Sequence, residues 1–308
     1  SDWGEIQTAK VKRNTQIRYQ GGVKSPVLTD VKKSDKVTVL EDEDAWTKVA
    51  SEDGMIGYIK TKALKDIGKE TTSRDFNEPE YTSISKDYKI NMVWHNVTNA
   101  TANSAVLTNL KSTKGLTTIA PTWFSLADTE GNISSLADED YVKQAHQSGL
   151  EVWAVLRDFH GGINSYDETY EVLSYTSKRQ KVIDQVISKA LASGVDGINL
   201  DFELVSSKCG VHYIQFVREL SAQCRQNQLV LSIDNYVPQP YNQHYDLEEQ
   251  GAVADYVIIM GYDEHTDGSY EAGSVASISY LKDGVENALL SVSSDKLIAG
   301  VPFFTRLW

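Results

Sequence analysis

Two patterns of apolar and polar residues divide the chain. Up to residue 68, short runs in which apolar and polar residues alternate are separated by turn residues, and no run has a helical period. Such alternation is typical of strands with one buried face. The runs are Ile6–Val11, Thr15–Tyr19, Lys36–Leu40, Trp46–Ala50 and Met55–Ile59. Five short strands in a segment of this size predict a small all-β barrel over residues 1–68.

The pattern changes after a polar stretch. Residues 69–87 have almost no large aliphatic side chains, which is typical of a linker between domains. From residue 88 to residue 308, short apolar runs alternate with helical stretches. We expect strands near 89–94, 116–120, 151–156, 195–202, 229–233, 255–260 and 297–301, and helices near 136–148, 177–192, 210–226, 243–251 and 275–291.

This alternation of strands and helices indicates an α/β domain around a parallel sheet. Seven strands at this rhythm, with no Gly-rich dinucleotide motif after the first, favour a (β/α)8 TIM barrel over a doubly wound sheet. The sequence shows no eighth strand. We therefore expect the barrel over 88–308 to be C-terminally incomplete, and to be closed by further chain or by a partner segment, because an open barrel exposes strand edges.

Composition narrows the class of protein. The 308 residues include 43 acidic and 30 basic side chains, for a net charge of −13, which argues against nucleic-acid binding. No apolar run approaches the roughly 18 residues that span a bilayer, so we expect a soluble protein. The first four residues show no signal-peptide pattern, so the compartment must follow from the function. Cys209 and Cys224 have the spacing of neither a disulfide scaffold nor a zinc cluster, and we expect free thiols.

Polar side chains recur at every second position of the fourth strand of the larger domain. The polar set is Asn199, Asp201 and Glu203, and the apolar set between them is Ile198, Leu200 and Phe202. Because side chains alternate along a strand, the polar set faces the barrel interior, at the carboxyl end where barrel enzymes have their active sites. Neighbouring carboxylates disfavour each other's ionisation, so we expect one of them, the outermost Glu203, to stay protonated and act as a general acid.

The polar residues of this strand would also suit a purely structural hydrogen-bond network or a carboxylate metal site. The histidines that would support a metal, His160, His212 and His265, lack ligand spacing on one element, so we predict no metal. Three successive inward polar residues in a barrel favour catalysis over a structural network, since barrel interiors are mostly apolar.

The segment Asp196–Glu203 resembles the D-G-x-D-x-D-x-E motif of family 18 glycoside hydrolases, the chitinase-like barrels, and departs from it only at Asn199. The sixth strand ends in Met260-Gly261-Tyr262-Asp263, similar to the M-x-Y-D of that family. Glu264-His265 and the segment Val301–Trp308 look more like the spore-cortex and cell-wall branch than like secreted chitinases. The resemblance covers residues 88–308.

The resemblance implies substrate-assisted hydrolysis with retention of configuration and without a cofactor. Glu203 would protonate the glycosidic oxygen and later activate water. Asp201 would orient the substrate acetamido group and stabilise the oxazolinium ion, and Tyr262 would hydrogen-bond its carbonyl. Asp196 would support the geometry of the strand.

The departures from the family pattern also carry expectations. Asn199 replaces an aspartate that shares a proton with the next carboxyl in chitinases, and we expect its amide to donate a hydrogen bond to Asp201 instead. The tryptophan that floors the sugar site on the family's eighth strand has no counterpart. Further residues at strand ends are candidates to line the cleft, with Tyr236 and Asp263 to contact the substrate and aromatic rings to stack on sugars: Asp158, His160, Asn235, Glu264, Arg306, Trp94, Trp123 and Phe124.

The N-terminal unit also resembles a known family. Lys36–Leu40, Trp46–Val49 and Asp53–Ile59 follow the order of motifs in bacterial SH3 domains. The resemblance implies a module that binds cell-wall peptidoglycan or peptides. The alternative is a packing appendage without a ligand.

Together these patterns predict a retaining glycoside hydrolase that cleaves β-linked N-acetylglucosamine bonds in peptidoglycan or spore cortex. We expect it outside the cell or associated with the cell wall or spore, with no nucleic-acid partner and no membrane span. One alternative is a chitin or chitooligosaccharide hydrolase. An alternative of another class is a non-catalytic carbohydrate-binding barrel, although a binding protein needs no proton donor at Glu203.

Overall fold

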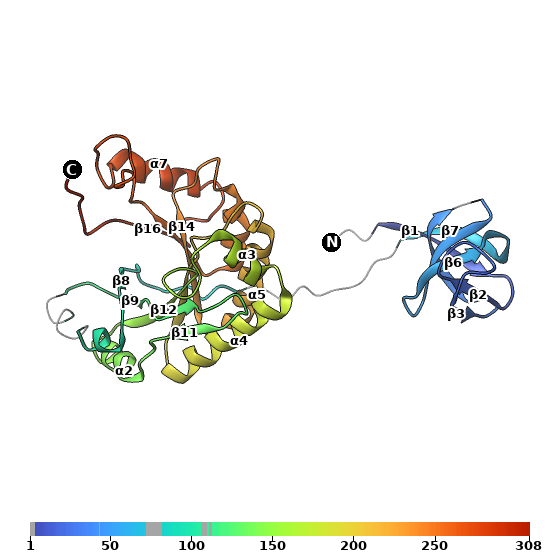
Figure 1. The fold of residues 1–308 in the computed structure, drawn as a ribbon, viewed down its shortest axis with the longest axis horizontal. Helices are drawn as coiled ribbons and strands as arrows, with labels where there is room; N and C mark the ends of the chain where they lie inside the picture. The colour runs from blue at the N-terminus through green and yellow to red at the C-terminus, as the bar shows by residue number, and fades with distance from the viewer. Residues whose placement is uncertain (1–3, 43, 72–81, 106–109, 111–112) are drawn as a thin grey trace. The chain divides into compact units, whose positions relative to one another are not determined.

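The computed structural model describes residues 4–42, 44–71, 82–105, 110 and 113–308 (Figure 1). The chain forms two compact units, Ser1–Glu80 and Tyr81–Trp308.

The described part of the N-terminal unit is one antiparallel sheet of seven strands. These are β1 (Glu5–Val11), β2 (Thr15–Arg18), β3 (Val27–Val31), β4 (Lys36–Asp42), β5 (Trp46–Ser51), β6 (Ile56–Lys60) and, after the 3-10 turn η1 (Thr61–Ala63), β7 (Leu64–Thr71). The neighbour order is β3-β2-β6-β5-β4-β1-β7. Apolar side chains on the inward face of the strands form the core of this unit, which is built from Ala9, Val11, Ile17, Val31, Val37, Val39, Val49, Ile59, Ala63 and Leu64. The all-β prediction is confirmed.

Two strands of this unit were not predicted. In β3 only Val31 is buried, and in β7 only Leu64 is, so neither strand shows alternation. Both lie at the edges of the sheet and are held by backbone pairing, β3 with β2 and β7 with β1. Backbone pairing leaves no signature in side-chain type, which is why pattern analysis missed them.

The larger unit alternates strands and helices. Its strands are β8 (Met92–His95), β9 (Thr118–Pro121), β10 (Phe124–Leu126), β11 (Ile133–Ser135), β12 (Glu151–Arg157), β13 (Gly197–Asp201), β14 (Val230–Tyr236), β15 (Tyr256–Met260) and β16 (Leu297–Gly300). Its helices are η2 (Ala100–Ala105), α2 (Glu139–Gln147), α3 (Tyr166–Leu173), α4 (Thr176–Ser193), α5 (Gly210–Gln226), η3 (Gln243–Tyr245), α6 (Leu247–Val253) and α7 (Ile278–Ala288). All seven predicted strands and five predicted helices are present, whereas β10, β11 and α3 were not predicted.

The main strands of this unit are parallel and neighbour one another in chain order, β8-β9-β12-β13-β14-β15-β16. The hairpin β10–β11 extends the sheet beside the carboxyl end of β12. Figure 1 shows helices α3, α4 and α5 covering the outer side of the sheet. Within the described residues no strand joins β8 to β16, so an eighth strand and a closed ring are not observed.

The helical layer packs as its sequence pattern predicts. On α4 the buried side chains include Val182, Ile183, Val186, Ile187 and Ala190. The helix ends at Gly194, whose φ of 76° is the left-handed conformation that glycine adopts without strain. No helix in the described part of the chain is long and apolar enough to cross a membrane.

The inside of the sheet changes character from one end to the other. At the amino ends of the strands, Trp153 and Tyr256 stack with ring centroids 5.5 Å apart, and Val230 packs with them. Partly buried apolar side chains from β8 and β16 complete this floor. Polar side chains begin above it, toward the carboxyl ends of the strands.

The predicted linker, 69–87, is too wide at both ends. Lys69 pairs with Gln7 within the sheet of the N-terminal unit, because β7 runs on to Thr71. In the larger unit, the backbone N–H of Ile84 donates to Asp255 (2.7 Å) and that of Lys86 to the Tyr256 hydroxyl (2.8 Å). Residues 72–81 lie outside the described residues.

Replacing Gly57 by alanine should destabilise the N-terminal unit. A Cβ at this position of β6 would lie 2.5 Å from the Arg18 carbonyl oxygen and 2.7 Å from Ile17 Cγ2. We expect Gly57→Ala to lower the free energy of unfolding of this unit by about 1–3 kcal/mol, measured by urea denaturation. Gly68→Ala is the matched control, because nothing lies within 4 Å of its added Cβ, and its effect should stay within about 0.5 kcal/mol. Equal effects of the two changes would contradict the packing argument.

Candidate active site

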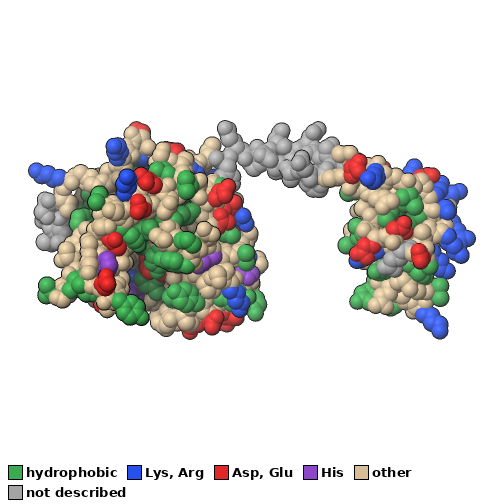
Figure 2. Space-filling model, turned by 90° about the horizontal axis from the view of Figure 1, so that it is seen from above, with side chains coloured by type: hydrophobic (Ala, Val, Ile, Leu, Met, Phe, Trp, Pro, Cys, Tyr) green, Lys and Arg blue, Asp and Glu red, His purple; other side chains and the backbone are tan. Residues whose placement is uncertain are grey.

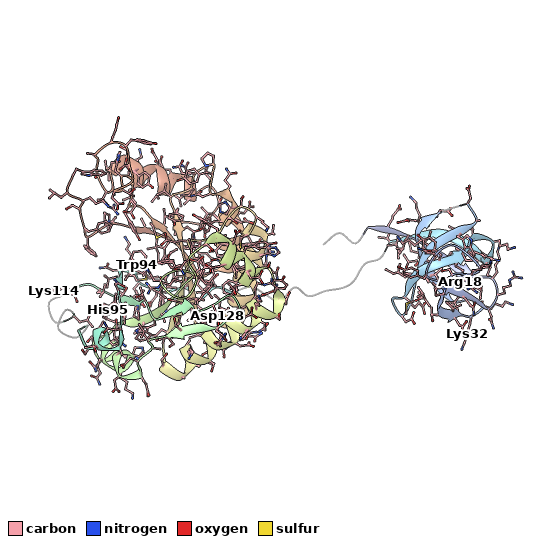
Figure 3. The ribbon with its side chains drawn as sticks, in the orientation of Figure 1. Arg18, Lys32, Trp94, His95, Lys114 and Asp128 are labelled. Atoms are coloured by element: carbon pink, nitrogen blue, oxygen red, sulfur yellow. The ribbon has the colours of Figure 1, made fainter. Side chains whose placement is uncertain are left out.

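A cleft of about 310 Å³ opens at the carboxyl ends of the central strands. Its lining residues are Trp94, Asn96, Thr122, Arg157, Phe159, His160, Asp201, Glu203, Asp234, Tyr236, Met260, Tyr262 and Asp263. Seven of the predicted site residues are therefore brought to one place by β8, β13, β14 and β15: Trp94, Asp201, Glu203, Tyr236, Met260, Tyr262 and Asp263. His160, which follows β12, also lines the cleft as expected. Figure 3 labels Trp94 on β8.

Strand register explains why two carboxyl groups lie side by side. Asn199 on β13 is level with Ser232 on β14, and Leu200 is level with Ile233. The next pair in this register is Asp201 and Asp234, and both side chains point inward because side chains alternate. On the other side of β13, Asp201 is level with Arg157 of β12.

Asn199 is fully buried beneath these groups. Its amide nitrogen donates to Asp234 Oδ1 (2.9 Å) and to Ser232 Oγ (3.0 Å). The Trp94 indole N–H donates to both Asn199 Oδ1 (3.0 Å) and Asp234 Oδ2 (3.2 Å). The expected hydrogen bond from Asn199 to Asp201 is wrong, because both amide protons are used toward β14.

The two neighbouring carboxyl groups cannot both be charged without a large cost. Burial raises the pKa of Asp234 to about 7, against the lowering effect of its bonds from Asn199 and Trp94. Burial, and then the charge of Asp234, raise the pKa of Asp201 well above its ordinary value. Asp201 Oδ1 is buried and has no hydrogen-bond partner within the described structure. The Asp201–Asp234 pair therefore retains a proton near neutral pH.

Glu203 lies just beyond β13 and is held by its neighbours. The Tyr236 hydroxyl donates to Glu203 Oε2, and the Tyr245 hydroxyl donates to the Glu203 carbonyl oxygen (3.2 Å). Asp158 accepts the backbone N–H groups of Glu203 (2.8 Å) and Leu204 (2.9 Å). These contacts fix both the backbone and the carboxyl group of Glu203 at the edge of the cleft.

Asp158 itself does not line the cleft, contrary to the prediction. It is fully buried on the helix side of β12 and also accepts a hydrogen bond from Thr169 (3.1 Å). Burial raises its pKa to about 6. Asn235 likewise faces outward, where it exchanges hydrogen bonds with Gln250 (2.7 and 3.0 Å). Each follows an inward-facing residue by one position, so each points to the opposite face.

Asp196 lies at the amino end of β13, away from the cleft. Its Oδ2 accepts the Val152 backbone N–H (2.8 Å) and lies 2.8 Å from His146 Nε2. It thus connects β13 to β12 and to α2. This position suits the supporting role expected for Asp196 and gives it no contact with a bound substrate.

The remaining predicted residues form the far wall. The Tyr262 ring meets Trp94 edge-on at 6.3 Å and Phe304 at 6.2 Å. Asp263 has a φ of 61° and accepts a hydrogen bond from Arg306 Nη1 (2.6 Å). Met260 is nearly buried on the interior face of β15.

Two of the candidate aromatic residues and one acidic residue are structural. Trp123 and Phe124 are buried, and the Trp123 indole N–H donates to Asn103 (2.9 Å), so neither ring is open to a sugar. Glu264 accepts the backbone N–H and hydroxyl of Ser277 at the start of α7 (2.6 and 3.0 Å).

Asp234 and Arg157 were not predicted. Both occupy inward positions of correctly predicted strand regions: Asp234 alternates with the apolar Ile233, and Arg157 follows Leu156 at the end of β12. Applying the alternation used for β13 to these neighbouring strands would have found both. Among the described residues, no group of three or more His, Cys, Asp or Glu side chains is placed to hold a metal ion.

Comparison with known proteins identifies the family. The model of the glycosyl hydrolases family 18 matches residues 94–308, and the chain belongs to this family. The model of the bacterial SH3 domain matches residues 13–65.

Two curated relatives come from Bacillus subtilis (strain 168). YvbX, named an uncharacterized glycosylase, is 27% identical over 192 residues, covering 59% of this chain and 55% of YvbX. YdhD, named as a candidate sporulation-specific glycosylase, is 29% identical over 186 residues, covering 58% of this chain and 43% of YdhD. The chain thus spans about half the length of these relatives.

Solved structures support the fold. The YdhD structure matches with a TM-score of 0.56 at 28% identity and covers 59% of this chain and 62% of its own. The structure of the spore cortex-lytic enzyme SleL of Bacillus megaterium QM B1551 matches with a TM-score of 0.58 at 19% identity. The match covers 70% of this chain and 51% of the SleL chain. The structure of a family 18 chitinase from Cycas revoluta in complex with (GlcNAc)3 matches with a TM-score of 0.59 at 20% identity. The match covers 70% of this chain and 68% of the chitinase chain. These family 18 neighbours imply the TIM-barrel fold for the larger unit.

The stability of the chain should fall as the pH rises from 5.5 to 8. The raised pKa values of Asp158, Asp201 and Asp234 mean that the folded state holds more protons than the unfolded state in this range. Each retained proton gives a slope of up to about −1.4 kcal/mol per pH unit in the free energy of unfolding. Asp234→Asn should flatten the profile, whatever its effect on the absolute stability.

Urea denaturation at each pH, followed by tryptophan fluorescence, measures this profile. Asp184→Asn on the exposed face of α4 is the control and should keep the wild-type slope. A slope unchanged by Asp234→Asn would show that this carboxyl group is already ionised in the folded protein.

Proposed function

We propose that this chain is a retaining glycoside hydrolase that cleaves β-linked N-acetylglucosamine bonds in bacterial peptidoglycan or spore cortex. The observation that carries the proposal is the meeting of Asp201, Glu203 and Tyr262 in one cleft at the carboxyl ends of β13 and β15. Membership of family 18 and the relatives named as glycosylases support it.

The proposed reaction uses the substrate's own acetamido group. Glu203 donates a proton to the glycosidic oxygen, the bond from this oxygen to the anomeric carbon breaks, and the acetamido carbonyl oxygen attacks the anomeric carbon from the opposite face. Asp201, which lines the cleft, accepts the acetamido N–H and stabilises the oxazolinium ion. Tyr262 donates a hydrogen bond to the carbonyl oxygen. Water then attacks the anomeric carbon and gives a proton to Glu203, while the bond from the acetamido oxygen to the anomeric carbon breaks. This opens the oxazolinium ring, restores the acetamido group and Glu203, and leaves the product with retained configuration.

The preference for peptidoglycan or spore cortex rests on two further observations. The N-terminal unit matches bacterial SH3 domains, for which we propose a role in holding the enzyme on the cell wall. Figure 2 shows Lys and Arg side chains gathered along one side of this unit, which suits an anionic wall surface although the whole chain is acidic. Together with relatives named for sporulation and cortex lysis, these observations favour a location outside the cell or in association with the wall or spore.

A chitooligosaccharide hydrolase is the second candidate, because one neighbour in fold is a chitinase that holds (GlcNAc)3. Mass spectrometry of products from purified peptidoglycan and from N-acetylglucosamine oligomers distinguishes the two. Muropeptides ending in reducing N-acetylglucosamine are expected for the wall enzyme. Cleavage of the oligomers alone would make the chain a chitooligosaccharide hydrolase.

Glu203→Gln should abolish turnover and leave sugar binding within a few-fold of wild type, because the amide keeps the shape of the side chain but has no acidic proton. Asp201→Asn should also cost a large factor in kcat. Product formation by the Glu203→Gln variant near the wild-type rate would remove the proposed mechanism.

Tyr236→Phe should lower kcat by about tenfold with a smaller change in KM, because the hydroxyl that holds the Glu203 carboxyl group is lost. Tyr241→Phe is the control, since this tyrosine in the segment that follows β14 is 79% exposed and is expected to leave both constants unchanged. Equal kinetics for Tyr236→Phe and wild type would show that the hydroxyl does not position Glu203.

A further inference from the structure

Arg157 occupies an unusual place for a cation. It ends β12 on the inward face, level with Asp201 in the sheet, and lines the same cleft as Glu203. The side chain is half-buried, and desolvation lowers the pKa of its guanidinium group. It sits over the Phe159 ring, 5.5 Å from the centroid.

Only one edge of the guanidinium group is occupied. Its Nε donates to Ser125 Oγ (3.0 Å), which fixes the plane of the group. Among the residues that the structure describes, neither Nη1 nor Nη2 of Arg157 has a hydrogen-bond acceptor, and no carboxylate oxygen lies within salt-bridge distance. An arginine has five N–H donors, so its terminal fork remains available to a ligand.

Two of the other charged groups of the cleft have hydrogen-bonded partners of their own, and Asp201 acts on Arg157 through its charge, with no hydrogen bond between them among the described residues. Asp263 is paired with Arg306 at 2.6 Å, and the Glu203 carboxyl group is held by Tyr236. A half-buried cation without a hydrogen-bonded counter-ion loses hydration without full compensation. A bound anion would supply this compensation, and a planar fork matches a carboxylate bidentately.

We propose that Arg157 binds a carboxylate of the substrate, and that this carboxylate is the lactyl group of an N-acetylmuramic acid. This inference rests on the proposed glycosidase function and deepens it. A polymer of N-acetylglucosamine alone is neutral and has no partner for Arg157, whereas a wall glycan carries a muramic acid at every second position, with a lactyl carboxylate wherever no stem peptide is attached. The approach of an anionic sugar to Asp201 and Asp234 would otherwise be opposed by their charge.

The chemistry of the wall makes the proposal more specific. The lactyl carboxyl group is a free anion only where no stem peptide is attached, because the stem is joined to it by an amide bond. Arg157 therefore favours glycan from which stem peptides have been removed. The class of reaction that supplies this substrate is hydrolysis of the amide bond between muramic acid and the peptide.

Three substrates test the proposal with the whole chain. The first is stem-free peptidoglycan glycan with its carboxylates, the second is the same glycan with each carboxylate converted to a neutral methyl amide, and the third is an N-acetylglucosamine oligomer. We expect wild type to prefer the carboxylate glycan to the amidated one by about tenfold or more in kcat/KM, as a charge-assisted bidentate contact gives. The preference should shrink as the salt concentration rises.

Arg157→Gln should bring the ratio of the two glycans to about one, and Arg157→Lys, which keeps the charge without the fork, should give an intermediate ratio. Arg218→Gln removes the same charge from an exposed position on α5, where Arg218 pairs with Glu249, and should keep the wild-type ratio. A wild-type ratio near one, or a ratio unchanged by Arg157→Gln, would overturn the proposal.

Absence of glycosidase activity would be distinguishable from absence of an anion site at Arg157. If wild type cleaves none of the three substrates, the proposed function fails, and calorimetric binding of the two glycans to wild type and to Arg157→Gln tests Arg157 separately. Tighter binding of the carboxylate glycan that is lost in Arg157→Gln would support the anion site, and equal binding would overturn it. Thermal melts of each variant show that the compared chains are folded.

Discussion

The hydrogen bonds around Asp234 are the constraint on which the site depends. This carboxyl group has almost no exposure to solvent, and it stands directly beside Asp201 in the register of β13 and β14. A buried carboxyl group is tolerated only when it is neutral or well bonded. Here two donors, the amide of Asn199 and the indole of Trp94, meet its two oxygens.

This arrangement gives a physical account of the departure from the family motif at position 199. An aspartate there would add a further acid beside Asp234, where the described side chains supply no hydrogen-bonded positive charge. An asparagine instead supplies donors to Asp234. The acid that the motif leads one to expect on β13 is thus found on the neighbouring strand, and the pair with Asp201 is kept. The apolar floor of Trp153 and Tyr256 lies beneath this layer.

Sequence patterns were sufficient for most of this architecture. Alternation along β13 predicted which side chains face inward, and helical spacing predicted the buried face of α4, because burial of apolar surface selects residue types at those positions. Contacts between strands were harder to predict. Asp234 is far from Asp201 in the sequence, and only the register of two strands makes them neighbours.

The wrong predictions concern features that residue type and position along the chain do not reveal. Asp158 and Asn235 were expected in the cleft because they lie at the ends of strands. Side chains alternate along a strand, however, and these two residues occupy positions that face the helices. Trp123 was expected to meet sugar because it follows a strand, yet its indole N–H is satisfied in the core. The edge strands β3 and β7 are defined by backbone pairing, which residue types do not record. Position along the sequence gives the end of a strand, whereas the side of the sheet must be counted residue by residue.

The two cysteines of the chain are free thiols, so the fold is stabilised by packing and does not depend on a disulfide bond between them. Both thiols are buried and free, at the first residue before α5 and near its end. Burial raises the pKa of Cys209 to about 12, so the reactive thiolate form is scarce. A reducing agent finds no disulfide to break between them, and an oxidant finds no accessible thiol. The cysteines of the folded chain therefore keep the same bonding in reducing and in oxidising surroundings.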